Sequence, residues 1–176
     1  MYHHQYTEFK SSTRRWTAID IDQIAQAVQT KWDQEFHYYH NDFIPFVPLR
    51  KPLNACRVAL VTTGGLYMPE DPPFDDAHPQ GDASFRAIAD NVDPNDLRTA
   101  HSHYDHRYVD EDRSVMFPLS ILHELVESAV IASTAARHYS FMGFITRPLR
   151  LIMDTAPEVA QSLRDQGVDI VLLSPG

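Results

Sequence analysis

Seven consecutive residues, 101–107, contain three histidines, an aspartate, a tyrosine and an arginine in the order HSHYDHR. Side chains of these types transfer protons, bind metals or hold anions. Successive side chains of a β-strand point to opposite faces, so His101, His103 and Asp105 would share one face of a strand here, with Tyr104 and His106 on the other. This pattern predicts a functional site in which His101, His103 and Asp105 act as catalytic residues and transfer protons near neutral pH.

Two other interpretations of the same stretch stay open. Two histidines and a carboxylate on one strand face are acceptable ligands for zinc or non-haem iron, so His101, His103 and Asp105 could form a metal site. Alternatively, the stretch is a polar network that fixes a long loop, with His103 hydrogen-bonded to Asp105 or to the backbone.

The composition limits the class of protein. A chain of 176 residues suits one domain, and a net charge of -9 argues against a nucleic-acid partner. No apolar stretch is long enough to span a membrane, and the N-terminus lacks the apolar region of a secretory signal. A single cysteine, Cys56, excludes an internal disulfide and a CxxC redox pair. We therefore expect a soluble, cytoplasmic, single-domain protein.

The order of the predicted elements favours an α/β fold. Apolar patterns predict strands over 57–63, 84–88, 97–103 and 138–145 and a final buried strand over 168–173. Helices are expected over 17–38 and 118–136, and from Thr155, as the cap, to just before Gly167. This alternation predicts a three-layer domain with a mostly parallel sheet, Rossmann-like or flavodoxin-like. We expect residues 1–16 to form an N-terminal arm and residues 64–96 a long irregular covering loop.

Three polar segments follow predicted strands: the turn with Gly64 and Gly65, the 101–107 stretch, and Ser174-Pro175. Ligands of open α/β sheets bind beyond the carboxyl ends of the strands, so these segments should meet at one edge. The predicted substrate-binding residues are Thr63, Gly64, Gly65, Arg86, Tyr104 and His106. For the glycines a tight turn is the alternative to an anion site, and for Arg86 the alternative to holding a substrate carboxylate is a surface ion pair.

Several separated motifs occur in an order that matches one known family. They are TTGGLY at 62–67, GDASFRAI at 81–88, HSHYD at 101–105, FPL at 117–119, MG at 142–143 and VDIVL at 168–172. From about Pro45 to its end, the chain resembles selenoprotein B of glycine, sarcosine and betaine reductase and the related D-proline reductase subunit.

The resemblance implies the reductive cleavage of a carbon–nitrogen bond in an amino acid or betaine. In that family a selenocysteine near a cysteine is the nucleophile, and partner subunits carry a pyruvoyl group or accept the product. The selenocysteine region follows the strand that matches 168–173, whereas the present sequence ends at Gly176. We therefore expect a substrate-side scaffold that needs a redox partner protein or a thiol cofactor of unknown identity. A non-catalytic binding module is the alternative, and a homo-oligomer is compatible with either.

Overall fold

The computed structural model describes residues 21–31, 34–37, 47–102 and 104–176. The chain divides into two compact units, Met1–Tyr39 and His40–Gly176. In the first unit, helix α2 spans Ile21–Lys31, within the helix predicted over 17–38. The predicted arm at 1–16 and His103 lie outside the described residues. Across the described part of the chain, no helix has the length and apolar character needed to cross a membrane.

The second unit is built around strand β1 (Arg57–Thr62), which has paired neighbours on both sides. Strand β7 (Ile170–Ser174) pairs with β1 in parallel along its length. On the other side, β5 (Ser133–Thr134) and β6 (Arg137–Phe141) pair in parallel with the first and second halves of β1. Strand β3 (Phe85–Ala89) extends the sheet beyond β6 and is antiparallel to it.

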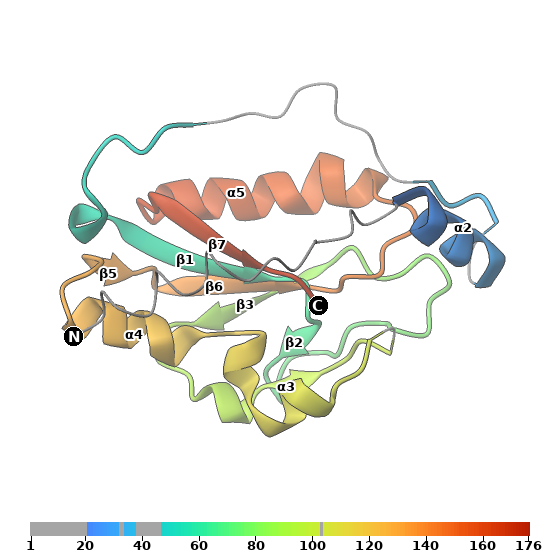
Figure 1. The fold of residues 1–176 in the computed structure, drawn as a ribbon, viewed down its shortest axis with the longest axis horizontal. Helices are drawn as coiled ribbons and strands as arrows, with labels where there is room; N and C mark the ends of the chain where they lie inside the picture. The colour runs from blue at the N-terminus through green and yellow to red at the C-terminus, as the bar shows by residue number, and fades with distance from the viewer. Residues whose placement is uncertain (1–20, 32–33, 38–46, 103) are drawn as a thin grey trace, which may run out of the picture. The chain divides into compact units, whose positions relative to one another are not determined.

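Helices pack on the two faces of this sheet (Figure 1). Val58 and Leu60 of β1 share one buried cluster with residues of α4 (Leu119–Glu127). Ala59, which points to the other face, is buried with Val159 and Leu163 of α5 (Ala156–Asp165). The predicted α/β class is confirmed, but the sheet is mixed because β3 runs antiparallel. The narrower Rossmann-like or flavodoxin-like assignment stays a prediction.

Strand β7 is not the buried strand that its apolar sequence predicted. Its side chains Val171, Leu172 and Leu173 are 37%, 43% and 71% exposed. Within the described residues, β7 lies at the edge of the sheet and pairs only with β1. An apolar run is typical of a strand covered on both faces, and edge position removes much of that cover.

The remaining elements correct several predicted bounds. Helix α4 ends at Glu127 rather than near 136, because Ala129 takes a positive φ of 56° and the chain then enters β5. The strand expected over 97–103 is reduced to β4 (Arg98–Thr99), which pairs with β2 (Leu66–Tyr67). The other short elements are helix α3 (Arg107–Glu111) and the 3-10 turns η1 (Leu53–Ala55), η2 (Pro94–Asp96) and η3 (Arg113–Val115).

The last helix begins differently from the prediction and ends as predicted. A π-helical turn, η4 (Leu151–Thr155), precedes α5. Thr155 occupies the predicted position before α5, but its side chain makes no capping hydrogen bond, and its hydroxyl donates instead to the carbonyl oxygen of Ala83 at 2.7 Å. Gly167 has a φ of +68° and stops the helix, because the left-handed region is accessible to glycine at little cost.

Candidate functional site

The turn after β1 is held by hydrogen bonds from three successive backbone N–H groups. Thr63 donates to the carbonyl oxygen of Ser174 at 3.0 Å, and Gly65 donates to that of Phe141 at 2.9 Å. The N–H of Gly64 donates to the Thr62 hydroxyl at 3.1 Å. Thr63, Gly64 and Gly65 thus join the carboxyl ends of β1, β6 and β7, and an anion at this turn would have to displace one of these acceptors.

Both glycines of the turn are closely packed, Gly64 against the side chain of Met116 and Gly65 against backbone. A Cβ on Gly64 would lie 2.5 Å from Cγ of Met116. A Cβ on Gly65, whose φ is +66°, would lie 2.6 Å from the carbonyl oxygen of Ala100 and 2.9 Å from Cβ of His101. The histidine-rich stretch therefore lies directly against the glycine turn, as predicted. The predicted reason is wrong, because β4 pairs with β2 in a separate antiparallel sheet and is not a strand of the main sheet.

Of the described residues in this stretch, His101 is the buried one, with 3% of its surface exposed. Its Nε2 lies 2.8 Å from the position that a Cβ on Gly143 would occupy, and the same position is 3.1 Å from the carbonyl oxygen of Thr63. The N–H of Gly176 donates to the Thr63 hydroxyl at 2.9 Å. The imidazole of His101 is thus close to the chain segments that follow β1 and β6, while the chain after β7 reaches the same turn.

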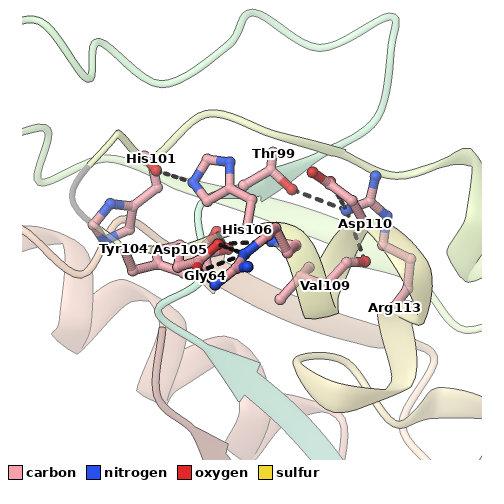
Figure 2. A network of polar contacts seen from close by, with 10 residues as sticks. Gly64, Thr99, His101, Tyr104, Asp105, His106, Val109, Asp110 and Arg113 are labelled. Atoms are coloured by element: carbon pink, nitrogen blue, oxygen red, sulfur yellow. Dashed lines mark hydrogen bonds and ion pairs between the residues drawn. The ribbon is translucent and has the colours of Figure 1, made fainter.

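Tyr104 and His106 support the His101 segment (Figure 2). The Tyr104 ring lies edge-on to the His101 ring, with 4.8 Å between the centroids, and 4.5 Å from the His106 ring. The Tyr104 hydroxyl donates to the carbonyl oxygen of Gly64 at 3.1 Å. Nε2 of His106 donates to the carbonyl oxygen of His101. Burial raises the pKa of Tyr104, so the phenol stays protonated near neutral pH.

Asp105 does not share a face with His101, so the strand-based alternation is wrong. The chain leaves β4 after Thr99, and residues 104–106 lead into α3. Asp105 is exposed and forms an ion pair with Arg107, whose Nη2 lies 2.5 Å from Oδ2 of Asp105. Among the described residues, no three histidine, cysteine, aspartate or glutamate side chains form a group that could hold a metal ion.

Arg86 holds the proline-rich part of the covering loop. Its Nε donates to the carbonyl oxygen of Pro72 at 2.7 Å, and its Nη2 donates to that of Pro73 at 3.0 Å. Its guanidinium also lies 4.2 Å from the centroid of the Phe74 ring. The structure therefore places Arg86 between β3 and the loop at 72–74, and a role in substrate binding stays a prediction.

A polar network at the opposite end of the sheet was missed in the sequence. Nδ1 of the fully buried His138 accepts the N–H of Leu60 at 2.9 Å, so the ring proton lies on Nε2. That Nε2 donates to Oδ1 of Asp90 at 3.0 Å, and Nε2 of His123 lies 3.1 Å from the same oxygen. Asp90, His123 and His138 are far apart in the sequence and form no motif, so no local signal could have joined them.

This network predicts an acid-sensitive stability. Burial lowers the pKa of His138, although the hydrogen bond and charge of Asp90 oppose that shift. The unfolded chain, with a histidine pKa of about 6.5, therefore binds a proton before the folded chain does. As the pH falls below about 6.5, the free energy of unfolding should decrease, by up to ~1.4 kcal/mol per pH unit. Well above about pH 6.5, His138 is neutral in both the folded and the unfolded chain, so it adds no pH dependence.

Urea unfolding between pH 5.5 and 7.5 checks this prediction. His138→Gln removes the titrating group, so its unfolding free energy should lose this part of the pH dependence. His37→Gln is the matched control, since His37 is exposed and lies in the first unit of the chain. An unchanged pH dependence in His138→Gln would contradict the assignment.

Comparisons with known proteins identify similar sequences. The sequence model of a family described as glycine/sarcosine/betaine reductase selenoprotein B matches residues 2–175. The chain is 36% identical over 131 residues to D-proline reductase subunit gamma of Acetoanaerobium sticklandii, covering 74% of this chain and 53% of that protein. No solved structure matches this chain.

Two further relatives are more distant. The chain is 27% identical over 135 residues to glycine reductase complex component B subunit gamma of Symbiobacterium thermophilum, covering 76% of this chain and 31% of that protein. It is 28% identical over 136 residues to sarcosine reductase complex component B subunit beta of Peptoclostridium acidaminophilum, covering 74% of this chain and 30% of that protein. The chain therefore spans about half the length of the D-proline reductase subunit and under a third of these two.

Proposed function

Because the chain belongs to the glycine/sarcosine/betaine reductase selenoprotein B family, we propose that it is a component of a cytoplasmic reductase complex. Its substrate is a small amino acid, betaine or related carboxylate. The relatives that carry the names of reductase subunits support this role. A doubly wound, Rossmann-like sheet, with the site beyond the carboxyl ends of its parallel strands, is the architecture that we propose for this scaffold.

The observation that carries the proposal is the position of His101. A buried imidazole lies against Thr63 and Gly143 at the carboxyl ends of β1 and β6, where ligands of open α/β sheets bind. Histidine transfers protons near neutral pH, and Tyr104, whose hydroxyl donates to the carbonyl oxygen of Gly64, holds its ring against the imidazole. We assign proton transfer to His101, with His103 and Asp105 as further candidates and the Thr63–Gly65 turn as the floor of the site.

The redox step requires a partner protein. Reductive cleavage of the carbon–nitrogen bond uses two electrons and two protons: the carbon gains a hydrogen and the nitrogen leaves as an amine. A dithiol of the partner would supply the electrons and become a disulfide. The only cysteine of the chain, Cys56, is buried ahead of β1, at the amino end of the strand, whereas His101 lies at the carboxyl end. The partner would therefore have to bring its reactive group to the edge formed by Thr63 and Gly176.

Reconstitution tests this proposal. The purified chain with a dithiol donor alone should cleave no carbon–nitrogen bond of glycine, betaine or D-proline. Cleavage should appear when the proteins encoded beside it are added, as released ammonia from glycine, released trimethylamine from betaine and a ring-opened amino acid from D-proline. In the reconstituted complex, His101→Gln should lower the rate at least ~10-fold, because a positioned proton donor or acceptor usually contributes more than that.

The control variant is His37→Gln, since His37 is exposed and lies in the first unit of the chain. It should leave the rate unchanged. If the complex is active and His101→Gln keeps the full rate, the chain is a non-catalytic binding module of that complex. If no combination cleaves the carbon–nitrogen bond of any of the three substrates, the proposed reaction is wrong.

A further inference from the structure

A cavity lies between the covering loop and the segment that follows β6. It has a volume of about 320 Å³ and includes Asp75, His78, Asp82, Ile145 and Arg150 in its walls. This volume is at the lower end of the range of ~300–1,000 Å³ that is usual for small-molecule sites. The cavity is therefore large enough for a ligand of the size of an amino acid.

Backbone contacts hold the two walls of the cavity together. Gly81 pairs with Ile145 in an isolated antiparallel bridge. The N–H of Thr146 donates to the carbonyl oxygen of Gln80 at 3.1 Å. Gly81 has a φ of +78°, and a Cβ there would lie 1.8 Å from the carbonyl oxygen of Phe144. The cavity is thus shaped by close backbone packing and is not a gap between two unconnected loops.

Two opposite charges in the walls have no protein partner. The guanidinium of Arg150 and the carboxylate of Asp75 both line the cavity. Within the described part of the chain, neither group forms a hydrogen bond or an ion pair, with each other or with another side chain. Asp82 differs, because it accepts the N–H groups of Asp75 at 3.1 Å and Ser84 at 2.8 Å. Arg150 and Asp75 are therefore the charges that remain for a ligand.

The wall around Arg150 favours an anion. Arg150 lies in the first turn of the helical segment that starts at Leu149 and continues through η4 into α5. The N-terminal end of a helix carries a partial positive charge, which adds to that of the guanidinium. Arg147 is a further basic wall residue. A carboxylate matches this end of the cavity, since Arg binds planar carboxylates through parallel N–H groups.

The acidic wall restricts the ligand to one that also carries a positive charge. An anion alone would leave the Asp75 carboxylate uncompensated and would be repelled by it and by Asp82. A cation alone would meet the same difficulty at Arg147 and Arg150. We propose that this cavity binds a small zwitterion, with its carboxylate at Arg150 and its ammonium group at Asp75.

The cavity adjoins the site of the proposed reaction. Ile145 lines the cavity, and Gly143, two residues earlier, lies against Nε2 of His101. Two extended residues span at most ~7 Å, so the two sites are neighbours. Identification of the zwitterion with the substrate of the reductase complex rests on the proposed function, whereas binding of a zwitterion does not.

Calorimetric titration of the full chain, without any partner protein, tests the proposal. The zwitterionic probes are glycine, betaine and D-proline. Acetate carries only the negative charge and choline only the positive charge, and inorganic phosphate is a further anion. At least one zwitterion should bind saturably, and acetate, choline and phosphate should each bind at least tenfold more weakly. Binding should also shift the backbone amide NMR signals of Gly81 and Ile145.

Charge variants give the sharper result. Arg150→Gln and Asp75→Asn should each weaken zwitterion binding at least tenfold, and Asp75→Asn should strengthen acetate binding because it removes the repulsion. Both residues are exposed, so both variants should fold like the parent chain. Circular dichroism checks this. Arg164→Gln on α5 is the control and should bind like the parent chain, since Arg164 is exposed and hydrogen-bonds Gln161.

The outcomes separate this proposal from the proposed function. Absence of saturable zwitterion binding, equal binding by the variants, or tighter binding of phosphate would overturn the zwitterion site. Arg150→Gln can also be tested in the reconstituted complex. If this variant binds no zwitterion but its complex keeps the full rate, the zwitterion site exists and is not the substrate site. Binding without any reductase activity would leave the zwitterion site standing and count against the proposed function alone.

Discussion

Gly81→Ala should lower the free energy of unfolding by about 2–5 kcal/mol. Two costs add at this position. A left-handed conformation costs a non-glycine residue about 1–2 kcal/mol, and forcing an extra group into a packed interior costs about 1–3 kcal/mol. Gly81 has a φ of +78°, and an added Cβ would lie 1.8 Å from the carbonyl oxygen of Phe144, which is backbone and cannot rotate away.

Gly167→Ala is the matched control for this prediction. Gly167 has a similar φ of +68°, but its nearest neighbour to an added Cβ is Nη1 of Arg57 at 3.7 Å, an ordinary contact. This variant should lose only the conformational part, about 1–2 kcal/mol. Urea unfolding of both variants measures the difference. Equal losses in the two variants would show that residues 80–81 and 144–146 are not packed together as the structure has them, and would also remove a wall of the zwitterion cavity.

Asp90→Ala should lower the free energy of unfolding by about 2–3 kcal/mol at pH 7, because a buried donor loses its acceptor. The side chain of His138 is fully buried, and its Nε2 donates to Oδ1 of Asp90 at 3.0 Å. Because Nδ1 of His138 accepts the N–H of Leu60, the ring cannot turn to find another acceptor without leaving that N–H unpaired. Loss of Asp90 therefore affects the packing of β1, β3 and β6 at once.

The pH dependence of this effect has a defined sign. Burial alone would raise the pKa of Asp90, but hydrogen bonds from His138, His123 and Thr134 outweigh it and hold the pKa below its ordinary value. The carboxylate's contribution is thus present above the unfolded pKa of about 3.9 and is lost as the pH falls through the lower folded value. The difference between Asp90→Ala and the parent chain should accordingly shrink below about pH 4.

Two variants sharpen the measurement on Asp90. Asp90→Asn keeps an acceptor oxygen and should lose less stability than Asp90→Ala. Glu127→Ala, at an exposed position of α4, should change the unfolding free energy by less than ~0.5 kcal/mol. If Asp90→Ala is as stable as Glu127→Ala, the hydrogen bond to His138 does not stabilise the fold.

Several features of this fold follow from short-range patterns. The apolar run 57–63 predicted β1 because a strand covered on both faces needs apolar side chains at every position. Gly167 predicted the end of the last helix because few other residues accept a positive φ. The separated motifs predicted the reductase family, and the matched family sequence confirms it. The meeting of Gly65 with the 101–107 stretch was also predicted, but not for the right reason, because β4 pairs with β2 in a separate two-stranded sheet and not in the parallel sheet.

Other predictions failed where neighbours in space decide the outcome. The alternation of His101 and Asp105 assumed a strand, but pairing with β2 ends at Thr99 and the chain turns. β7 has the sequence of a buried strand, and its exposure follows from its place at the sheet edge, which its own residues do not encode. For Arg86 the sequence offered a substrate carboxylate or a surface ion pair. The carbonyl groups of the proline-rich loop accept its donors, and a role in substrate binding stays a prediction.

The sequence by itself determined the α/β class and the family. The class depends on the period of apolar residues, which acts over a few residues, and the family on short motifs in a fixed order. The pairing of β4 with β2, which brings His101 to the glycine turn, is a tertiary contact. Only the tertiary structure decided which charged groups have partners: Asp90 with two histidines, Asp105 with Arg107, and Asp75 and Arg150 with no described residue. Hydrogen bonds form between atoms a few ångströms apart, and the folded chain sets those distances between residues that are remote in sequence.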